Sequence, residues 1–366
     1  MKIGVYPVLM SSPADTSGLE KLISTGVIDP QTLICGIGKT EGNGGANDFT
    51  RQLATVSYQQ MLAKFLGTVE TVNQRISFAW SGGTEGVLSP HATFFTREEN
   101  DKGIQPSDGT LAVSVKTTRD FRPEEVGRMP EILAVADATR AAMADCGVSD
   151  PHDVHFAFVK GPLLTPAAIK DARSRGQSVV TTDPNRSKVF ARGATALGVA
   201  IALGEVDAAA VNDDMVGTAL DLYSEVACTS AGGELTKCEV ILMVNSRTAH
   251  SDYRIGHGVL HDPLDVEGVL TTLRTAGLNF DCLPAMAERQ RITAIFAKAE
   301  ASPTGEINGY RNTMLSDADI NYERHARAAV GAVIASVTKN PAIFLSGGTE
   351  HQCLPGEAPI AVIVRT

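Results

Sequence analysis

Several features that mark common classes of protein are absent from this sequence of 366 residues. Its six cysteines include no CxxC pair, which argues against both a cysteine-based zinc site and a disulfide-stapled scaffold. Aromatic residues make up only 5%, and acidic residues outnumber basic ones by 42 to 32, so the chain lacks the stacking groups and the basic surface that bind nucleic acid. The net charge of −10 also disfavours an anionic membrane. We therefore expect the partner to be a small molecule.

Long apolar runs are missing as well. No stretch of about 18 apolar residues is present to cross a bilayer. The first residues reach Pro7 and Asp15 without the apolar core of a signal peptide. Scattered cysteines are typical of reduced thiols, so we expect a soluble, cytoplasmic protein. The remaining composition, 43% hydrophobic and 20% charged, is that of a globular protein with a sizeable core.

One short pattern occurs three times in the chain. SGGTE occupies residues 81–85 and again 346–350, and SAGGE occupies residues 230–234 between them. Each copy follows a short apolar run of the kind that forms a strand. One match would carry little weight in a chain with 34 glycines, but three in the same context indicate an internal repeat.

Basic residues occur at matching places before each serine motif. A predicted strand ends in a lysine with Gly or Pro beyond it, and a predicted helix rich in Ala, Leu and Val opens with an arginine. The lysines are Lys39, Lys160 and Lys298, and the arginines are Arg51, Arg192 and Arg324. The lysine and the serine lie farthest apart in the middle unit, which predicts an insertion around residues 172–188.

These repeats predict an α/β fold built from three tandem, structurally similar units with pseudo-threefold symmetry around a central active site. Each unit is expected to run strand, helix, strand with lysine, loop, helix with arginine, strand with Ser-Gly. The units span residues 1–103, 110–246 and 252–366, and their boundaries fall in polar segments around residues 96–109 and 245–252.

The repeated residue types indicate hydrolysis of an amide. A lysine in a partly dry cleft among arginines loses its proton more easily and becomes a general base. A serine beside such an amine becomes a nucleophile, as in the Ser–Lys variants of acyl transfer. Glycines after the serine let backbone amides approach an oxygen, and arginine forks suit carbonyl groups in one plane. Three such units around one axis would match a small flat ring with three carbonyl groups.

Simpler interpretations of these residues, in which they have no part in a functional site, are less favoured. A single Ser-Gly-Gly after a strand is most simply a tight turn, but three copies with matched lysines and arginines favour a functional site. His257 and His261 lie four residues apart, yet the glycines around them indicate a strand or turn and not a metal site. The loop KTEGNGG lacks the order of residues of a phosphate-binding loop.

The three motifs, with their lysines and arginines, resemble the cyanuric acid hydrolase and barbiturase family of cyclic amide hydrolases over essentially the whole chain. The resemblance implies opening of the cyanuric acid ring to carboxybiuret, which loses carbon dioxide to give biuret. By position, Lys160 is the implied base and Ser230 the implied nucleophile, with Lys39 and Lys298 in supporting pairs. The implied substrate-binding residues are Arg51, Ser81, Gly82, Arg192, Ser230, Ala231, Arg324, Ser346 and Gly347. Ala231 departs from the glycine of the other two copies and marks the middle unit as special.

The same resemblance implies no cofactor for catalysis, a structural divalent cation (Mg²⁺ or Ca²⁺) and a homotetramer. The implied metal ligands are Glu300, Thr349, Gln352, Cys353, Leu354 and Glu357. One carboxylate with several carbonyl groups is a chemically reasonable set for a hard cation.

Two alternatives stay open at this point. A barbiturase would open barbiturate to ureidomalonate, and the two flat rings differ at one ring position only. A non-catalytic protein that binds a small planar metabolite would keep the arginines and need no basic lysine. We favour cyanuric acid because its threefold symmetry best matches three similar units.

Overall fold

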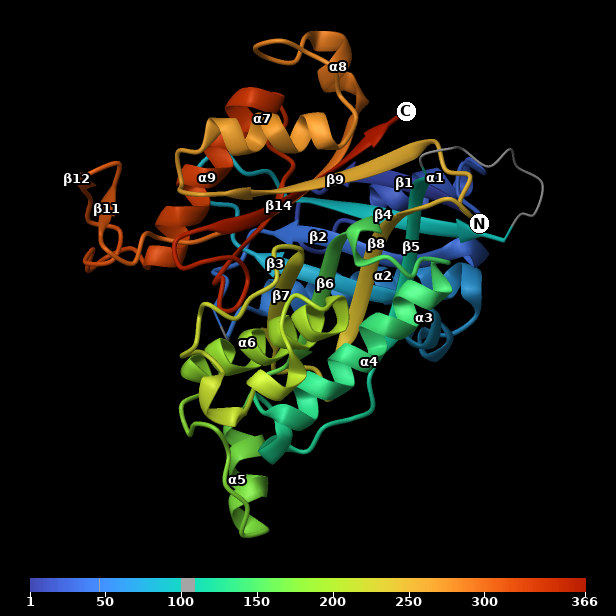
Figure 1. The fold of residues 1–366 in the computed structure, drawn as a ribbon. Helices are drawn as coiled ribbons and strands as arrows, with labels where there is room; N and C mark the ends of the chain where they lie inside the picture. Colours follow the sequence, from blue (N-terminus) through green and yellow to red (C-terminus); the bar gives the residue numbers. More distant parts are fainter. Residues whose placement is uncertain (46, 100–108) are drawn as a thin grey trace.

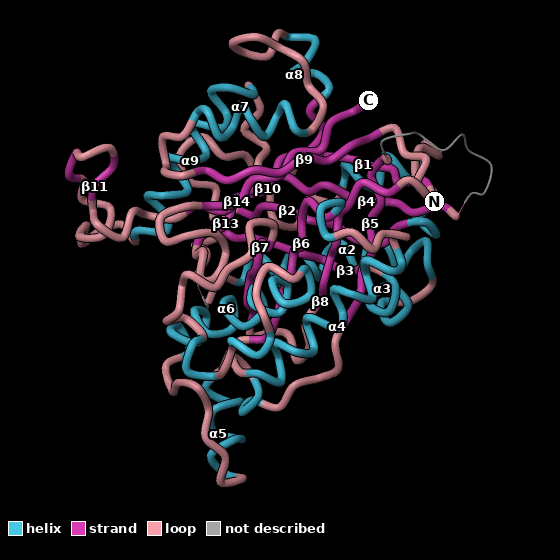
Figure 2. The backbone as a smooth tube through the Cα atoms, in the orientation of Figure 1, coloured by secondary structure: helices cyan, strands magenta, loops and turns pink. Residues whose placement is uncertain are grey.

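The structure is a computed structural model that describes residues 1–45, 47–99 and 109–366. The predicted boundary between the first two units falls largely on residues 100–108, which lie outside the described residues. Strands fill the middle of the molecule and helices cover the outside (Figures 1 and 2). No helix in the described ranges is long and apolar enough to span a bilayer.

The first four-stranded sheet comes from the first predicted unit, with strand order β1-β4-β2-β3. Its strands are β1 (Lys2–Leu9), β2 (Leu33–Thr40), β3 (Ser77–Gly82) and β4 (His91–Glu98). The helices of this segment are α1 (Ser17–Ser24), α2 (Phe49–Leu66) and α3 (Val69–Arg75). β2 and β3 are parallel, whereas β4 runs antiparallel to both β1 and β2.

The second sheet has the corresponding order, β5-β8-β6-β7. Its strands are β5 (Thr110–Thr117), β6 (Val154–Pro162), β7 (Ala227–Gly232) and β8 (Glu239–Ser246). The helices are α4 (Met129–Asp145), α5 (Pro166–Ser174) and α6 (Pro184–Leu203). The expected insertion of the middle unit includes the end of α5, which projects from the body of the molecule (Figure 1), and the segment that leads into α6.

The third sheet, read from its other edge, is β9-β14-β10-β13 and repeats the same order. Its strands are β9 (Tyr253–Leu260), β10 (Ile292–Ala299), β13 (Phe344–Gly347) and β14 (Ala358–Arg365). The helices are α7 (Val266–Thr275), α8 (Met286–Arg291) and α9 (Tyr322–Thr338), and a small hairpin joins β11 (Glu306–Ile307) to β12 (Tyr310–Arg311). Each sheet thus consists of strands from one predicted segment, with first strand, fourth, second and third in sequence.

The fourth strand of each sheet is the main difference between the observed order of elements and the order predicted for each unit. β4, β8 and β14 follow the serine motifs and lie between the first two strands of their sheets. Because the repeated unit was defined by motifs that end at Ser-Gly, the expected order of elements stopped one strand too early.

Side chains that alternate along each strand contribute to two kinds of hydrophobic core. On β8, Ile241 and Met243 face a core shared by all three sheets, whereas Val240 and Leu242 face the helices of their own segment. Successive side chains of a strand point to opposite faces, so one strand serves both cores. Phe296 on β10 packs against rings from the other two sheets, Phe95 at 6.4 Å and Phe156 at 4.9 Å between centroids. The shared core therefore holds the three sheets back to back.

The helices that carry the arginines begin at well-formed caps. Asp48, Asp183 and Asn321 precede α2, α6 and α9, and each side chain accepts a hydrogen bond from an amide of the first turn. Such caps satisfy backbone N–H groups that have no partner within the helix. The caps fix where each helix starts.

Candidate active site

Each predicted lysine lies directly beside its predicted serine on neighbouring parallel strands. The register pairs are Lys39–Ser81, Lys160–Ser230 and Lys298–Ser346. All three lysines are almost completely buried. The repeat seen in the sequence therefore corresponds to one geometry that occurs three times.

The first pair is joined by a hydrogen bond. Lys39 Nζ donates to Ser81 Oγ at 3.0 Å and to the carbonyl oxygens of Gly82 and of Leu345, which lies on β13 of the third sheet. Burial, together with the positive charge of Arg327, holds the pKa of Lys39 well below its usual value. This amine is placed to accept a proton from its serine.

The other two lysines have different partners. Lys298 Nζ donates to the carbonyl oxygens of Thr229 at 2.8 Å and Gly347 at 2.9 Å, and burial lowers its pKa to about 8. Lys160 Nζ instead donates to the Glu234 carboxylate at 2.6 Å. The middle pair is thus the one whose lysine is held by a carboxylate of its own motif.

A narrow inner cavity collects the repeated Ser-Gly or Ser-Ala pairs and the arginines from all three segments. None of the three repeated lysines is in its lining, and Lys160 lines a separate pocket with Glu234. The inner cavity is lined by Gly44, Arg51, Ser81, Gly82, Lys188, Arg192, Ser230, Ala231, Glu323, Arg327, Ser346 and Gly347. Every predicted Ser-Gly or Ser-Ala pair is in this set, as are two of the three predicted arginines. An outer pocket of about 400 Å³ shares five of these residues and opens to the surface, so the cavity is reached through it.

The third arginine of the cavity differs from the prediction. Arg324 lines the outer pocket with 47% of its side chain exposed, whereas Arg327 lines the inner cavity with 4% exposed. The two residues are one turn apart on α9, so motif order alone does not distinguish them. Arg192 shows the reason, because it lies well inside α6, more than two turns after Pro184, and not at the opening of the helix. Packing depth, and not distance from the helix start, selects the arginine.

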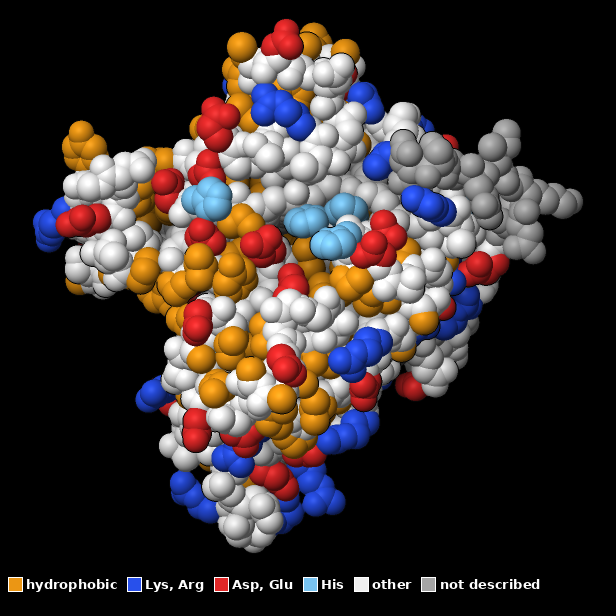
Figure 3. All heavy atoms as spheres, in the orientation of Figure 1, with side chains coloured by type: hydrophobic (Ala, Val, Ile, Leu, Met, Phe, Trp, Pro, Cys, Tyr) orange, Lys and Arg blue, Asp and Glu red, His pale blue; other side chains and the backbone are white. Residues whose placement is uncertain are grey.

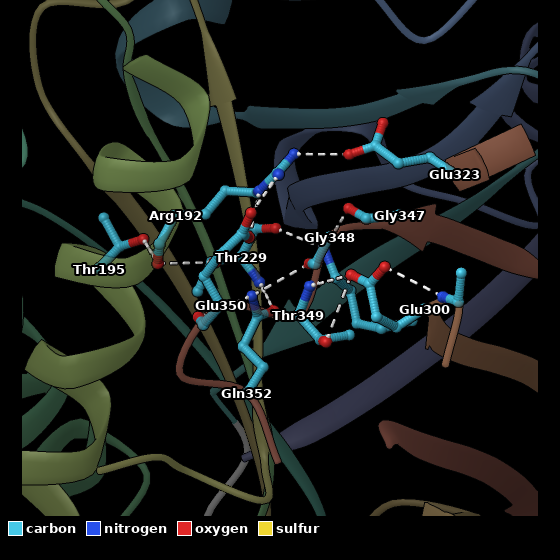
Figure 4. Close-up of polar contacts among 12 residues, drawn as sticks. Arg192, Thr195, Thr229, Glu300, Glu323, Gly347, Gly348, Thr349, Glu350 and Gln352 are labelled. Atoms are coloured by element: carbon cyan, nitrogen blue, oxygen red, sulfur yellow. Dashed lines mark hydrogen bonds and ion pairs between the residues drawn. The ribbon is translucent and has the colours of Figure 1, made fainter. Parts of the chain in front are cut away.

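The glutamate at the end of each serine motif was not singled out from the sequence, yet it links the segments. Arg192 donates to Glu350 with two hydrogen bonds of 2.7 and 2.6 Å (Figure 4). Arg327 donates to Glu85 in the same way, at 2.9 and 2.6 Å. Burial works to raise the pKa of Glu85, but the Arg327 hydrogen bonds bring it below its ordinary value. The glutamate is present in all three copies of the motif, and this repetition is the sequence signal that could have identified it.

A third link of this kind is not present among the described residues. Glu234 of the middle motif is paired with Lys160, and Arg51 donates instead to the Gly45 carbonyl at 2.9 Å. Arg51 Nε is buried without a hydrogen-bond partner among the residues that the structure describes. The site therefore departs from threefold regularity at the middle motif, where the sequence also departs through Ala231.

A glycine is required where the third motif passes Arg192. Gly348 has φ of +81°, and a Cβ at this position would lie 2.3 Å from the guanidinium carbon of Arg192. Both the left-handed backbone and the close approach exclude a larger residue. The second glycine of this motif thus allows the arginine to reach Glu350.

The segment predicted to hold a metal surrounds Glu300. Its carboxylate accepts hydrogen bonds from the amides of Ala301 at 3.0 Å and Thr349 at 3.1 Å (Figure 4). Burial and the charge of Glu350 raise the pKa of Glu300 to about 7. A cation would relieve this burial cost, so the carboxylate suits a hard metal ion.

Only some of the other predicted metal ligands line the pocket beside Glu300. Thr349 and Cys353 line one pocket of about 240 Å³ with Glu300. The Gln352 side chain is used elsewhere, since its Oε1 accepts from the Thr229 amide at 2.7 Å. Glu357 also faces away, toward His261 at 2.8 Å, and Leu354 is half-exposed at 41%. Within the described residues no cluster of three or more His, Cys, Asp and Glu side chains is arranged to hold a metal, so main-chain carbonyls of this loop would have to complete the set.

The surface in the view of Figure 3 carries acidic and basic side chains interspersed, without one large patch of either sign.

All six cysteines are free, and five of them are buried. His257 lies on β9, in the strand that its glycines indicated.

Comparison with known proteins agrees with this geometry. Residues 4–365 match the model of the amidohydrolase ring-opening protein family, and the chain belongs to that family. It is 60% identical to a cyclic amide hydrolase of Azorhizobium caulinodans and 48% identical to a cyanuric acid amidohydrolase of Enterobacter cloacae, with both chains covered completely in each case. Barbiturase 1 of a Nocardioides species is 41% identical over 99% of this chain and 98% of its own. A solved cyanuric acid hydrolase matches the fold with a TM-score of 0.94 at 45% identity, covering 100% of this chain and 99% of that one.

Proposed function

We propose that this protein is a cyclic amide hydrolase that opens the ring of cyanuric acid to carboxybiuret, which then loses carbon dioxide to give biuret. The observation that carries the proposal is the inner cavity, in which three Ser-Gly or Ser-Ala pairs and three arginines from three segments surround one space. The greater identity to cyanuric acid amidohydrolases than to the barbiturase supports cyanuric acid over barbiturate.

A paired assay tests the substrate. Purified protein is supplied with cyanuric acid or with barbituric acid, and ring opening is followed by the loss of ring absorbance and by chromatography of the product. Biuret from cyanuric acid at a kcat/KM well above that for barbiturate is the expected result. Ureidomalonate as the preferred product would make the protein a barbiturase, and binding without turnover of either ring would make it a binding protein.

We propose that the three segments form pseudo-threefold repeats of one unit, 1–103, 110–246 and 252–366. The repeated strand order supports this, as do the three lysine–serine register pairs. A symmetric site offers equivalent donors to three equivalent carbonyl groups. We propose Arg51, Arg192 and Arg327 as the ring-binding arginines, with Arg327 in place of Arg324.

For catalysis, we propose Ser230 as the nucleophile and Lys160 as its base. Neutral Lys160 takes the Ser230 hydroxyl proton while Oγ bonds to a ring carbonyl carbon. The C–N bond then breaks, and the lysine returns the proton to the leaving nitrogen. Water adds to the acyl-enzyme and releases the carboxybiuret product. The Glu234 carboxylate, 2.6 Å from Lys160 Nζ, fixes where the amine lies on the strand next to Ser230.

Lys39 and Ser81 form a second candidate pair. Their hydrogen bond of 3.0 Å and the lowered pKa of Lys39 favour it. Lys298 donates to carbonyl groups only and is assigned a supporting role.

We propose that Glu300, with carbonyl groups of Thr349–Glu357, holds a structural Mg²⁺ or Ca²⁺. The cation would neutralise a buried carboxylate that lies near Glu350 and Glu323. It would stabilise the loop that carries Glu350, the partner of Arg192. Catalysis itself then needs only groups of the chain.

We also propose a homotetramer, by likeness to the family, and a cytoplasmic location, supported by the free cysteines. Light scattering behind a sizing column measures the first, and fractionation of cells that express the protein measures the second.

A further inference from the structure

Lys188 lies at the inner cavity but belongs to no repeated motif. It lies on α6 one turn before Arg192 and lines both the inner cavity and the outer pocket. Among the described residues, its ammonium group makes no hydrogen bond and no ion pair within 4 Å. A half-buried amine with no such partner at a ligand cavity requires an explanation.

The charges that face Lys188 do not neutralise it. Glu323 and Glu350 lie near it, but Glu350 is held by two hydrogen bonds from Arg192, and Glu323 lies 3.4 Å from the same guanidinium. Arg192 and Arg51 are the nearby cations. Burial and these two cations lower the pKa of Lys188, against the opposing effect of the two carboxylates. An anion in the cavity would offset the cost of keeping the amine charged.

Arg51 is the second cation without a carboxylate. Its counterparts Arg192 and Arg327 are each paired with a motif glutamate, whereas the equivalent Glu234 pairs with Lys160. Within the described residues, Arg51 keeps one carbonyl contact and a buried Nε without a hydrogen-bond partner, and Glu234 acts on it at longer range while paired with Lys160. In that part of the chain, Arg51 and Lys188 are thus the two cations of the inner cavity that no carboxylate contacts directly.

We propose that Lys188 and Arg51 form an anion-binding side of the inner cavity, which holds the substrate as its ring monoanion and fixes its orientation. This inference rests on the proposed function. An N–H between two carbonyl groups is unusually acidic because its anion spreads the charge over both oxygens. Two neighbouring oxygens of that kind match one guanidinium fork and one ammonium group. Three equivalent sets of donors would bind a threefold-symmetric ring equally well in three orientations. A positive charge on one side of the cavity makes one orientation of the anionic ring more favourable than the other two.

Direct binding tests the inference without turnover. Calorimetry measures the affinity of barbiturate, an acidic trioxo ring, and of dihydrouracil, a neutral ring of similar size, for the wild type and for K188M. We expect K188M to weaken barbiturate binding by about tenfold or more and dihydrouracil binding by less than about twofold. K188R, which keeps the charge, should restore most of the barbiturate affinity.

Kinetics with cyanuric acid supply a second readout. K188M should raise KM more than it lowers kcat, and the rise should shrink at pH values below the first pKa of the ring, where the ring is neutral. K170M on α5 is the matched lysine substitution far from the cavity and should match the wild type. R324Q removes a cation from the outer pocket and should have a smaller effect on barbiturate binding than K188M.

Three results would overturn the inference: equal losses for the charged and the neutral ring, a loss with R324Q as large as with K188M, or no loss with K188M. Should K188M fail to fold, as judged by its thermal melt, K188Q is measured in its place. A wild type that binds barbiturate with this preference but does not hydrolyse cyanuric acid would refute the proposed function and leave the anion-binding side standing.

Discussion

Arg327 on α9 holds the Glu85 carboxylate with two hydrogen bonds, across the boundary between the third and the first sheet segments. Both side chains are almost completely buried, with 4% and 6% exposed. The same contact joins Arg192 to Glu350 across the next boundary. These ion pairs fix the arginines at the cavity wall and couple the stability of the three-segment assembly to the geometry of its site.

Replacing Arg327 should affect both stability and activity. R327M removes both short hydrogen bonds to the buried Glu85 carboxylate and leaves it the 3.3 Å contact with Arg324. Breaking a buried ion pair typically costs about 3–5 kcal/mol, which is the upper range expected here. We expect a clear fall in melting temperature and a loss of kcat/KM for cyanuric acid of two orders of magnitude or more. R324Q, with its half-exposed side chain, should change either quantity far less. The reverse ranking would restore Arg324 as the third ring-binding arginine.

The three serines offer a comparison within one molecule. S81A, S230A and S346A make the same small change at three equivalent register positions. Removing an activated serine nucleophile costs several orders of magnitude in kcat, whereas removing a donor costs about 10²–10³-fold. We expect the largest loss in S230A. A largest loss in S81A would instead assign the chemistry to Lys39 and Ser81.

Buried Lys298 should make stability depend on pH. Its folded pKa of about 8 lies below the unfolded value, so the unfolded chain binds more protons between about pH 8 and 10.5. The contribution of Lys298 to stability therefore rises with pH in this window, by a limit on the order of 3 kcal/mol. The difference in unfolding free energy between wild type and K298M isolates this contribution from other groups, and denaturant melts across the window measure it. A pH-independent difference would show that Lys298 is not the cause.

Removing divalent cations should lower the melting temperature of the wild type. A ligand that binds only the folded state stabilises it, so adding Mg²⁺ or Ca²⁺ after chelation should restore the melt. E300Q should abolish this response. E357Q should retain it, because the Glu357 carboxylate faces His261. A wild type whose melt ignores both chelator and cation would contradict the proposed metal site.

Much of the fold could be predicted from the sequence because the repeated pattern identified its three segments. Three copies of one order of strands, helices and basic residues identified the segments, and in the structure each lysine lies beside its serine. The fourth strands were missed because they carry no motif residue. Their alternating burial, as in Ile241 and Met243 against Val240 and Leu242, is a packing pattern shared with many strands.

The parts of the site that escaped prediction depend on contacts between segments. Arg324 and Arg327 lie on adjacent turns and both contact Glu85, and it is burial that distinguishes them, with 4% of the Arg327 side chain exposed against 47% of Arg324. Lys188 belongs to no repeated motif, and its importance follows from the absence, among the described residues, of a hydrogen-bond or ion-pair partner within 4 Å. Sequence spacing does not report either fact.

The kcat and the ring affinity of K160A decide whether Lys160 is the catalytic base. Loss of a general base typically costs about 10²–10⁴-fold, so kcat for cyanuric acid should fall by that factor while the ring still binds. The variant also leaves Glu234 free to pair with Arg51, so binding is measured separately by calorimetry with barbiturate. A collapsed kcat with retained binding is the result that a Ser–Lys hydrolase predicts, and a kcat equal to that of the wild type would contradict the assignment of Lys160.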